Sequence, residues 1–368
     1  MEFALTEEQE ELASIVRELL SEESGAGVAR ESWSRASGYN ESLWQKMCGE
    51  IGVASLAIPE EYGGAGFSYL ETHLVLEELG RALTASPFFG SAVLAAQTIL
   101  SIASHEEALR LLPGVGSGTT IAALAWATKA GRWDPTNIGV TASEASGTWS
   151  VRGEAPLVLF GAQADLLLTF AQTDNGLGLF EVAADEVSVQ ESSAMDSTLR
   201  FATVTWDGHS ARLLGRVSDE QLHALWNLVA AGISALQIGG ASACLELTVE
   251  YSQQRVQFGR TIGSFQALKH RMAEMYVSVE TATTASRAVA IALTTGEEDA
   301  SELARLAKIW CSEAFLIVAG EMIQLHGGIA ITWEHDAHLF FKRSHAMSQL
   351  FGSPRELRRS VESALSLA

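Results

Sequence analysis

The chain has 368 residues, 47% of them hydrophobic, and a formal net charge of -21, so it is long and apolar enough to bury the cores of two or three domains. This strong negative charge disfavours nucleic acid and anionic membranes as partners. Three widely spaced cysteines without metal-ligand spacing, Cys48, Cys244 and Cys311, indicate a reducing, cytoplasmic location, and the acidic, polar N-terminus predicts no signal peptide.

The first 112 or so residues are predicted to be helical. Thr6 and Gln9 have the spacing of a capping box, and apolar residues follow them at helical intervals. A second helix is expected to begin near Ser42, and two more to cover 68–83 and 87–103. This part of the chain therefore reads as an N-terminal α-helical domain, with a boundary at about residue 115.

A glycine-rich loop, Pro59-Glu-Glu-Tyr-Gly-Gly-Ala-Gly66, interrupts these helices. It could bind a phosphate, or it could be a tight turn between two helices. A phosphate-binding P-loop needs a Lys-Ser/Thr pair after its glycines, and none follows here. The interhelix turn is therefore the favoured interpretation.

The middle of the chain, residues 116–216, changes to short β-prone runs. Glycine, asparagine and aspartate separate several of them, which is typical of a small antiparallel sandwich or barrel rather than of alternating β-α units. The predicted strands cover 120–126, 138–142, 148–151, 157–159, 166–170, 177–182, 187–190 and 202–206.

Helical periodicity returns from residue 217 to the end. Long segments with short joins predict an antiparallel four-helix bundle, in four or five helical segments over 218–254, 264–295, 298–325, 335–350 and 354–366. The apolar run 225–240 contains Asn227, Ser234 and Gln237 and is too short to span a bilayer, so it predicts a buried helix. The fold class is therefore mainly α with a central β domain.

One segment of the bundle, 255–271, is a basic island in this acidic chain. It contains four cations, Arg255, Arg260, Lys269 and Arg271, one histidine and no carboxylate. Clustered cations repel one another unless an anion offsets them, so the segment is a candidate phosphate site. It also reads as a helix, a turn containing glycine and a second helix, which leaves backbone N–H groups available.

The order of helices, β domain and bundle, together with four motifs, resembles the acyl-CoA dehydrogenase family over essentially the full length. Trp44, Gly52-Val-Ala and the 59–66 loop are similar to the family's N-terminal domain, and Glu77-Glu-Leu-Gly-Arg81 follows at the expected place. The bundle carries Tyr251-Ser-Gln-Gln-Arg-Val-Gln-Phe-Gly-Arg with Ile262-Gly-Ser-Phe-Gln, and later Gln324-Leu-His-Gly-Gly-Ile-Ala-Ile.

The resemblance implies FAD bound at a dimer interface, with two turns of one subunit holding the phosphates and adenine while the isoalloxazine ring lies in the neighbouring subunit. An arginine can make charge-assisted bonds to a pyrophosphate, glutamines offer amide bonds, and glycines allow close backbone approach. For the two phenylalanines, plain core packing is an equal alternative. The residues that the resemblance assigns to FAD are Arg255, Gln257, Phe258, Ile262, Phe265, Gln266, Gln324, Gly327 and Gly328.

The family's reaction is α,β-desaturation of an acyl-CoA thioester, in which a glutamate removes the α-proton and hydride passes to flavin N5. Counted without gaps from Gly327-Gly328, the position of that glutamate is Phe351, which cannot take a proton. Some members carry the base on the first bundle helix, but the matching residues 226–229 contain no carboxylate. Glu246 and Glu250 lie nearer the phosphate end and read as a solvated helix face.

The region expected to face the flavin ring also departs from the family pattern. In this chain, the loop 127–135 stands where the family has a Thr-Glu-Pro-Gly sequence and lacks that sequence. The family's aromatic-Ile-Thr/Ser strand is replaced by Leu157-Val-Leu159, which has no hydroxyl. The phosphate end is thus kept, while the base and the ring pocket are lost.

These departures resemble the base-lacking subunit of heterotetrameric actinobacterial acyl-CoA dehydrogenases that act on steroid side-chain CoA thioesters. The resemblance implies a catalytic homologous partner in an α2β2 assembly, an acyl-CoA substrate and electron-transfer flavoprotein as acceptor. One alternative is a self-sufficient homotetramer whose base is Glu334 or Asp336; another is a degenerate acyl-CoA-binding or interaction protein.

The histidines of the bundle suggest no further chemistry. His335, His338 and His345 lack a convincing ligand set, so no metal site is predicted. His326 beside Gly327 is expected to pack in a helix-end turn rather than to titrate in a reaction.

Overall fold

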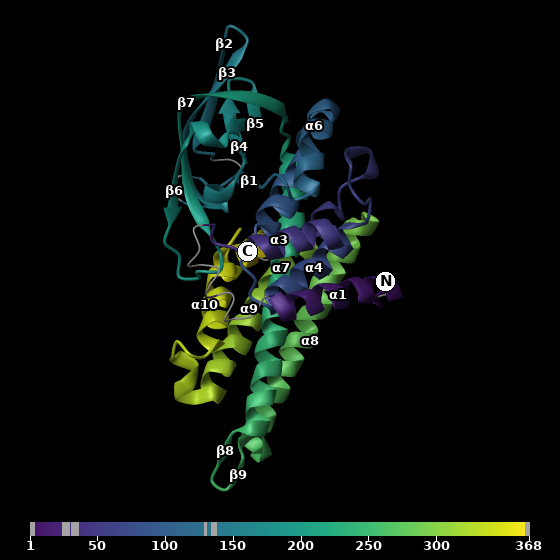
Figure 1. Cartoon of the computed structure of the whole chain (residues 1–368), viewed down its shortest axis with the longest axis vertical. Coiled ribbons are helices and arrows are strands. Elements are labelled where there is room, and N and C mark those ends of the chain that lie inside the picture. The colour runs from purple at the N-terminus through teal and green to yellow at the C-terminus, as the bar shows by residue number, and fades with distance from the viewer. Residues whose placement is uncertain (1–3, 24–29, 31–36, 129–130, 134–137, 365–368) are drawn as a thin grey trace. The chain divides into compact units, whose positions relative to one another are not determined.

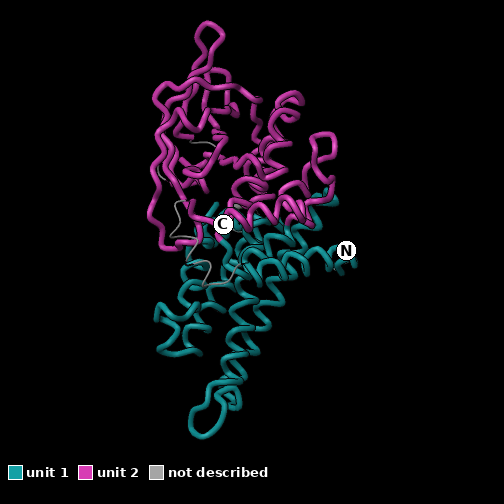
Figure 2. The backbone as a smooth tube through the Cα atoms, in the orientation of Figure 1, with its two compact units in different colours: residues 1–29, 73–84, 230–368 teal, residues 30–72, 85–229 magenta. Residues whose placement is uncertain are grey.

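The computed structural model describes residues 4–23, 30, 37–128, 131–133 and 138–364. It has the predicted fold class: N-terminal helices, a central β-barrel and a C-terminal helical domain (Figure 1). The backbone forms two compact units, one of residues 1–29, 73–84 and 230–368 and the other of 30–72 and 85–229 (Figure 2). Each unit combines distant segments, so the domain boundaries near 115 and 216 stay predictions.

The N-terminal helices form where capping and apolar spacing predicted them, and the capping box before the first is confirmed. Thr6 N–H donates to Gln9 Oε1 at 3.1 Å, and Gln9 N–H donates to Thr6 Oγ1 at 3.3 Å. One helix, α6, was not predicted as a separate element; Ser104 caps it by accepting from Glu107 N–H. The helices are α1 (Glu7–Glu23), α3 (Glu41–Lys46), α4 (Tyr69–Arg81), α5 (Ala96–Ile102) and α6 (His105–Gly116), with π-helical turns at Met47–Ile51 and Phe89–Ala95.

The glycine-rich loop 59–66 is a tight turn, as favoured from the sequence. Its backbone N–H groups are used internally: Gly63 donates to Glu60 O, Gly64 to Pro59 O and Gly66 to Ile58 O, at 2.9 to 3.2 Å. A side chain on Gly64 would lie 2.0 Å from Ile58 O, so only glycine fits. The N–H groups that a phosphate would need are already bonded to the protein.

The middle segment closes into a barrel in which β4, β2, β3, β7 and β5 pair in turn and β5 pairs back with β4. This is the predicted small barrel with mostly antiparallel pairs, but the sheet is mixed, because β1 and β2 run parallel to β4. The predicted runs 148–151 and 157–159 are one strand, whose pairing with β7 shifts between Ala155 and Val158. The strands are β1 (Ala122–Ala125), β2 (Val140–Ala145), β3 (Thr148–Leu159), β4 (Leu166–Thr173), β5 (Gly176–Ala183), β6 (Ser188–Ser192) and β7 (Phe201–Arg216).

The barrel interior is filled by alternating side chains. Val204 and Trp206 on β7 point inward with Val151, Leu167 and Phe180, and all five are at most 1% exposed. This alternation is the period-two pattern from which the strands were predicted.

The C-terminal helices match the predicted segments closely. In the first compact unit, α9 packs against α8, α10 and α11. The helices are α7 (Asp219–Gln254), α8 (Gln266–Thr295), α9 (Ala300–His326), α10 (Ala337–Gln349) and α11 (Pro354–Ala364).

Two stretches, α7 and Ala300–Ile331, are long and apolar enough to cross a membrane by length and composition. The apolar window of α7 is 83% buried inside the protein, which confirms the predicted buried helix. The window in the second stretch is only 39% buried, so α9 presents much of its apolar surface outward.

Two glycines let α4 and α7 touch backbone to backbone. A Cβ on Gly239 would lie 1.8 Å from Glu77 O, and one on Gly80 would lie 2.1 Å from Leu236 O. This close crossing places the Glu77–Arg81 motif of α4 against α7 within one compact unit.

Candidate functional site

The basic island begins with a hairpin between α7 and α8. Strands β8 (Val256–Gln257) and β9 (Arg260–Thr261) pair, and the two residues between them, Phe258 and Gly259, have φ of 54° and 78°. Two consecutive left-handed residues are typical of the two-residue turn that suits paired strands. The hairpin therefore projects Phe258, whose side chain is 91% exposed, from the end of the helices (Figure 1).

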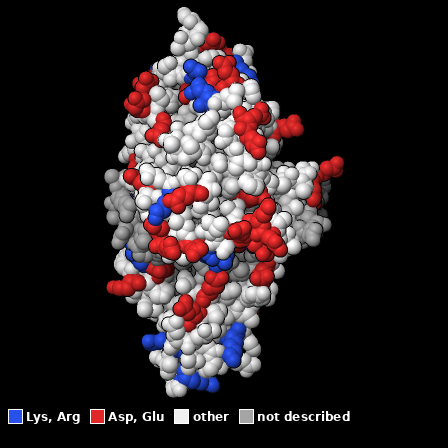
Figure 3. Space-filling view, turned by 45° about the vertical axis from the view of Figure 1, so that its right-hand side comes forward, with Lys and Arg blue, Asp and Glu red and all other residues white. Residues whose placement is uncertain are grey.

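The cations of this segment are exposed and mostly unpaired. Arg255, Arg260 and Lys269 are exposed and form no ion pair with any described residue, whereas Arg271 pairs with Glu321 at 2.5 Å. Arg260 lies over the ring of Phe265, with its guanidinium carbon 3.9 Å from the ring centre. Figure 3 shows Lys and Arg atoms at the hairpin end with no Asp or Glu among them, whereas acidic side chains gather further along the same face.

The second motif forms the end of α9. Gln324 lies in the last turn of the helix with an exposed side chain, and Gly327 follows with φ 68° and ψ -147°. Such a backbone conformation favours glycine. A Cβ on Gly327 or Gly328 would meet nothing within 4 Å, so the space beside this turn is open to an incoming group.

Aromatic rings join the two turns inside this chain. Tyr251 stacks on His326 with ring centres 4.3 Å apart and an interplanar angle of 23°, and His326 lies 4.6 Å from His335. Arg255 N–H donates to Tyr251 O at 2.8 Å, and Tyr251 OH donates to His326 O at 3.4 Å. The hairpin and the Gly327-Gly328 turn are therefore neighbours.

His326 packs in the helix-end turn, as expected. It is 5% exposed, its Nδ1 lies 2.8 Å from Met322 O, and burial lowers its pKa. A neutral imidazole that donates from Nδ1 satisfies this contact. Sequence reasoning gave neither His326 nor Tyr251 a part in the site, and only their ring contacts reveal one.

The arrangement suits the phosphates of a nucleotide cofactor. Exposed arginines without carboxylate partners, free amide side chains and an open glycine turn are the groups that bind a pyrophosphate. The structure brings Arg255 and Gly327 together through Tyr251. Gln257, Ile262 and Gln266 lie on the same hairpin and its continuation into α8.

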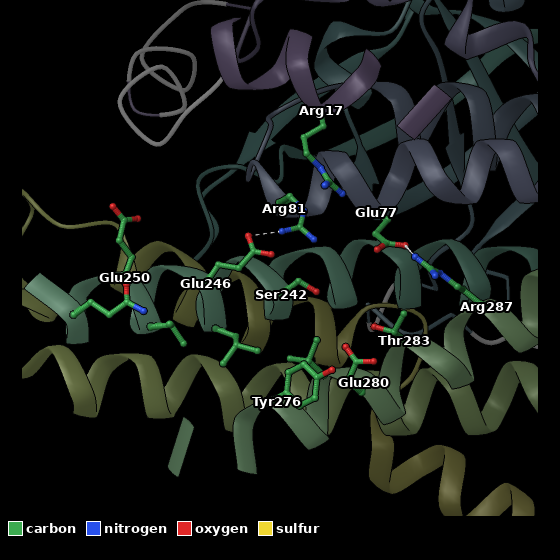
Figure 4. A pocket seen from close by; sticks show the side chains of 14 residues that line it. Arg17, Glu77, Arg81, Ser242, Glu246, Glu250, Tyr276, Glu280, Thr283 and Arg287 are labelled. Atoms are coloured by element: carbon green, nitrogen blue, oxygen red, sulfur yellow. Dashed lines mark hydrogen bonds and ion pairs between the residues drawn. The ribbon is translucent and has the colours of Figure 1, made fainter. Parts of the chain in front are cut away.

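A cavity of about 610 Å³ lies between helices of the first compact unit (Figure 4). Its three arginines already have carboxylate partners: Arg17 with Glu78 at 2.6 Å, Arg81 with Glu246 at 2.6 Å and Arg287 with Glu77 at 3.5 Å. Desolvation of Glu77 by burial raises its pKa, although Arg287 opposes this. These ion pairs link α4 to α1, α7 and α8, so none of the three arginines that line this cavity is free to bind a phosphate.

The position expected for the base has no acid. Phe351 is 3% exposed with φ 56°, and Gly352 follows with φ 110°. Gly352 O accepts a hydrogen bond from the fully buried Lys308 at 3.3 Å. Lys308 therefore holds the backbone of this turn, and the side chain at the position of the base is the apolar ring of Phe351.

The sequence also predicted two departures from the family pattern in the region expected to face the flavin ring. Leu159 ends β3 and is 4% exposed, so a buried leucine replaces the family's hydroxyl. The loop 127–135 lies partly outside the described residues. Of the two alternative bases, Glu334 is exposed and Asp336 stands just before α10.

The comparisons with known proteins agree with this fold. Residues 6–119 match the acyl-CoA dehydrogenase N-terminal domain, and residues 224–365 match the C-terminal domain. Acyl-CoA dehydrogenase IpdE2 from Mycolicibacterium smegmatis is 36% identical over 97% of this chain and 99% of its own length. The IpdE2 of Mycobacterium tuberculosis is 38% identical over 97% of both.

The chain belongs to the acyl-CoA dehydrogenase family. Among solved structures, it is similar to a chain of the ChsE4-ChsE5 complex from Mycobacterium tuberculosis, with 28% identity, a TM-score of 0.91 and 100% coverage of both chains. A variant of the steroid ACAD Tcur3481-Tcur3483 gives 28% identity and a TM-score of 0.88 over 98% of both. Acyl-CoA dehydrogenases are FAD-dependent, and the hairpin and glycine turn fit the phosphate half of that cofactor.

Proposed function

We propose that this acyl-CoA dehydrogenase chain is the non-catalytic subunit of a heteromeric enzyme and completes an FAD site whose ring and base belong to a homologous subunit. One contrast carries the proposal. The two turns proposed to bind the phosphates are exposed and Arg255 and Arg260 form no ion pair with a described residue, whereas a buried phenylalanine, Phe351, stands at the position of the base.

The chain's own residues would bind and orient the cofactor. Arg255 would donate charge-assisted hydrogen bonds to the pyrophosphate, Gln324 would offer its amide, and the Gly327 turn would let the backbone approach. Phe258 and Phe265 would cover the adenine or ribose; their rings are 6.2 Å apart and perpendicular. FAD supplies the redox chemistry of α,β-desaturation when bound.

Among the described residues, the position expected for the base offers no group that could remove the substrate's α-proton. A general base must lie within hydrogen-bond reach of the proton and have a matched pKa, and Phe351 can do neither. Glu246 is held by Arg81, and Glu250 accepts from Gln254 Nε2 at 3.0 Å on an exposed helix face. A glutamate of the partner is therefore the proposed base.

An exposed apolar stripe on α9 provides a surface for that partner. Leu306, Trp310 and Ile317 are 50%, 50% and 55% exposed, and they follow one face of the helix toward Gln324. Large apolar side chains at helical spacing need a protein surface to cover them. The stripe ends at the FAD turn, which is consistent with a cofactor shared across an interface.

The relatives suggest the substrate class. The two heteromeric relatives include one named as a steroid ACAD. We infer an acyl-CoA thioester with a bulky, steroid-derived acyl group, an α2β2 assembly and electron-transfer flavoprotein as acceptor. Cys48, Cys244 and Cys311 are buried free thiols, which fits the proposed cytoplasmic location.

The test is to purify the chain alone and together with a candidate catalytic homologue, and to record visible flavin absorbance and acyl-CoA-dependent reduction of an artificial acceptor. We expect both signals only in the joint preparation. Flavin and turnover in the lone chain would instead support the homotetramer that uses Glu334 or Asp336. A colourless joint preparation would support an acyl-CoA-binding or interaction protein.

A further inference from the structure

We propose that Tyr251 is a positioning residue that sets the spacing between the two FAD-binding turns. This inference rests on the proposed FAD half-site and concerns how that site keeps its geometry. Tyr251 is half-buried in the last turn of α7 and reaches both motifs at once.

The first link is through the backbone of Tyr251. Its carbonyl accepts from Arg255 N–H at 2.8 Å, and Arg255 O accepts from Ile262 N–H, also at 2.8 Å. The hairpin is therefore attached to the helix end at the residue that binds the pyrophosphate. Movement of the Tyr251 backbone would move Arg255 with it.

The second link is through the side chain. Tyr251 OH donates to His326 O at 3.4 Å, and this carbonyl belongs to the peptide that leads into Gly327. The tyrosine ring also stacks on the His326 ring, which is in turn held by Met322 O. One residue thus restrains the peptide before the glycine turn by a hydrogen bond and by ring packing.

The function of this double link follows from the conformational freedom of the two turns that it connects. Glycine at 327 can take many backbone conformations, and the side chain of Arg255 is exposed. A pyrophosphate must be contacted by both turns together, and preorganising them reduces the entropy lost on binding. Tyr251 would provide this preorganisation through its two links.

The experiment compares Tyr251→Phe and Tyr251→Leu in the joint complex, with dissociation constants measured for FAD and for FMN. FMN lacks the adenylate half that the turns would hold. We expect FAD to dissociate about fivefold more easily from Tyr251→Phe, which loses only the hydroxyl, and at least about tenfold more easily from Tyr251→Leu. FMN binding should be unchanged in both. Tyr276→Phe, on α8 in the separate cavity, is the matched control and should leave FAD binding unchanged.

A merely structural role would lower the affinities for FAD and FMN alike, together with the melting temperature, and that result would overturn the inference. So would an unchanged FAD affinity in Tyr251→Leu. Arg255→Ala distinguishes a failure of the positioning role from a failure of the FAD half-site. If Arg255→Ala weakens FAD binding while Tyr251→Leu does not, only the positioning role fails. If neither variant affects FAD, the half-site itself is wrong.

Discussion

Lys308 is the residue whose environment is least expected from its chemistry. It is fully buried, and its amine donates to Ser312 Oγ and to the carbonyls of Met347, Ser348 and Gly352 at 3.2 to 3.4 Å. Desolvation lowers its pKa to about 7, and no described carboxylate forms an ion pair with it. It binds the C-terminal end of α10 and the turn at Phe351.

This pKa predicts a specific dependence of stability on pH. The folded value of about 7 lies below the unfolded value of 10.5, so between them the unfolded chain holds a proton that the folded chain does not. Stability should therefore rise with pH above about 7, by up to about 1.4 kcal/mol per pH unit from this group. The penalty is fully present below pH 7.

Chemical denaturation of the wild-type chain and of Lys308→Met at several pH values tests this. The pH should stay between about 7 and about 8.5, because free cysteines begin to titrate above that range. Lys308→Met should lose this part of the slope. The comparison uses slopes, because the variant also leaves three carbonyls without a donor. Equal slopes in both proteins would show that Lys308 stays charged when folded.

Some residues of the candidate site could be predicted from the sequence, and others could not. Arg255, Gln324 and Gly327 were predicted because their motifs resemble those of the acyl-CoA dehydrogenase family, and the structure shows Arg255 exposed, with no ion pair to a described residue. Tyr251, His326 and Lys308 were not predicted as part of any site. Their roles depend on partners 39 to 75 residues away in sequence, which no local pattern reveals.

Among the elements, α4 and α7 cross with their backbones in direct contact, which makes the crossing sensitive to substitution. A Cβ on Gly239 would overlap Glu77 O, and backbone cannot move aside as a side chain can. Gly239→Ala should cost about 3 kcal/mol of unfolding free energy, because the helices must separate.

Thermal or denaturant unfolding of Gly239→Ala measures this cost. Gly49→Ala is the matched control, since Gly49 is exposed and has nothing within 4 Å of an added Cβ. It should change stability by less than about 1 kcal/mol. A Gly239→Ala protein as stable as the control would mean that the helices do not touch as described.

The elements themselves were largely predictable. Helical spacing located the bundle, and alternation located the strands, because both patterns are local. The parallel pairing of β1 and β2 with β4 was missed, since pairing joins residues far apart in the chain. The helix α6 was missed because Pro113 and two glycines near its end obscured its periodicity.

For the whole molecule, a net charge of -21 makes the exposed cations of the hairpin exceptional. On the proposed function, a shared FAD would account for the lack of ion pairs between these cations and described residues, and the apolar stripe on α9 would contact the partner. The chain would then retain the residues that bind the phosphates of FAD and lack the base that removes the substrate's proton. On this account its activity exists only in the assembly.

The most direct measurement is the flavin-to-protein ratio of the joint complex carrying Arg255→Ala in this chain alone. Removing a charge-assisted contact to the pyrophosphate should weaken FAD binding at least about tenfold. The complex should therefore elute intact by size but pale, with activity restored by excess FAD. Arg152→Ala, far along the sequence on the barrel and paired with Asp207, is the control and should leave the ratio unchanged. A complex with Arg255→Ala that retains full flavin and full activity would contradict the central claim that this chain completes its partner's FAD site.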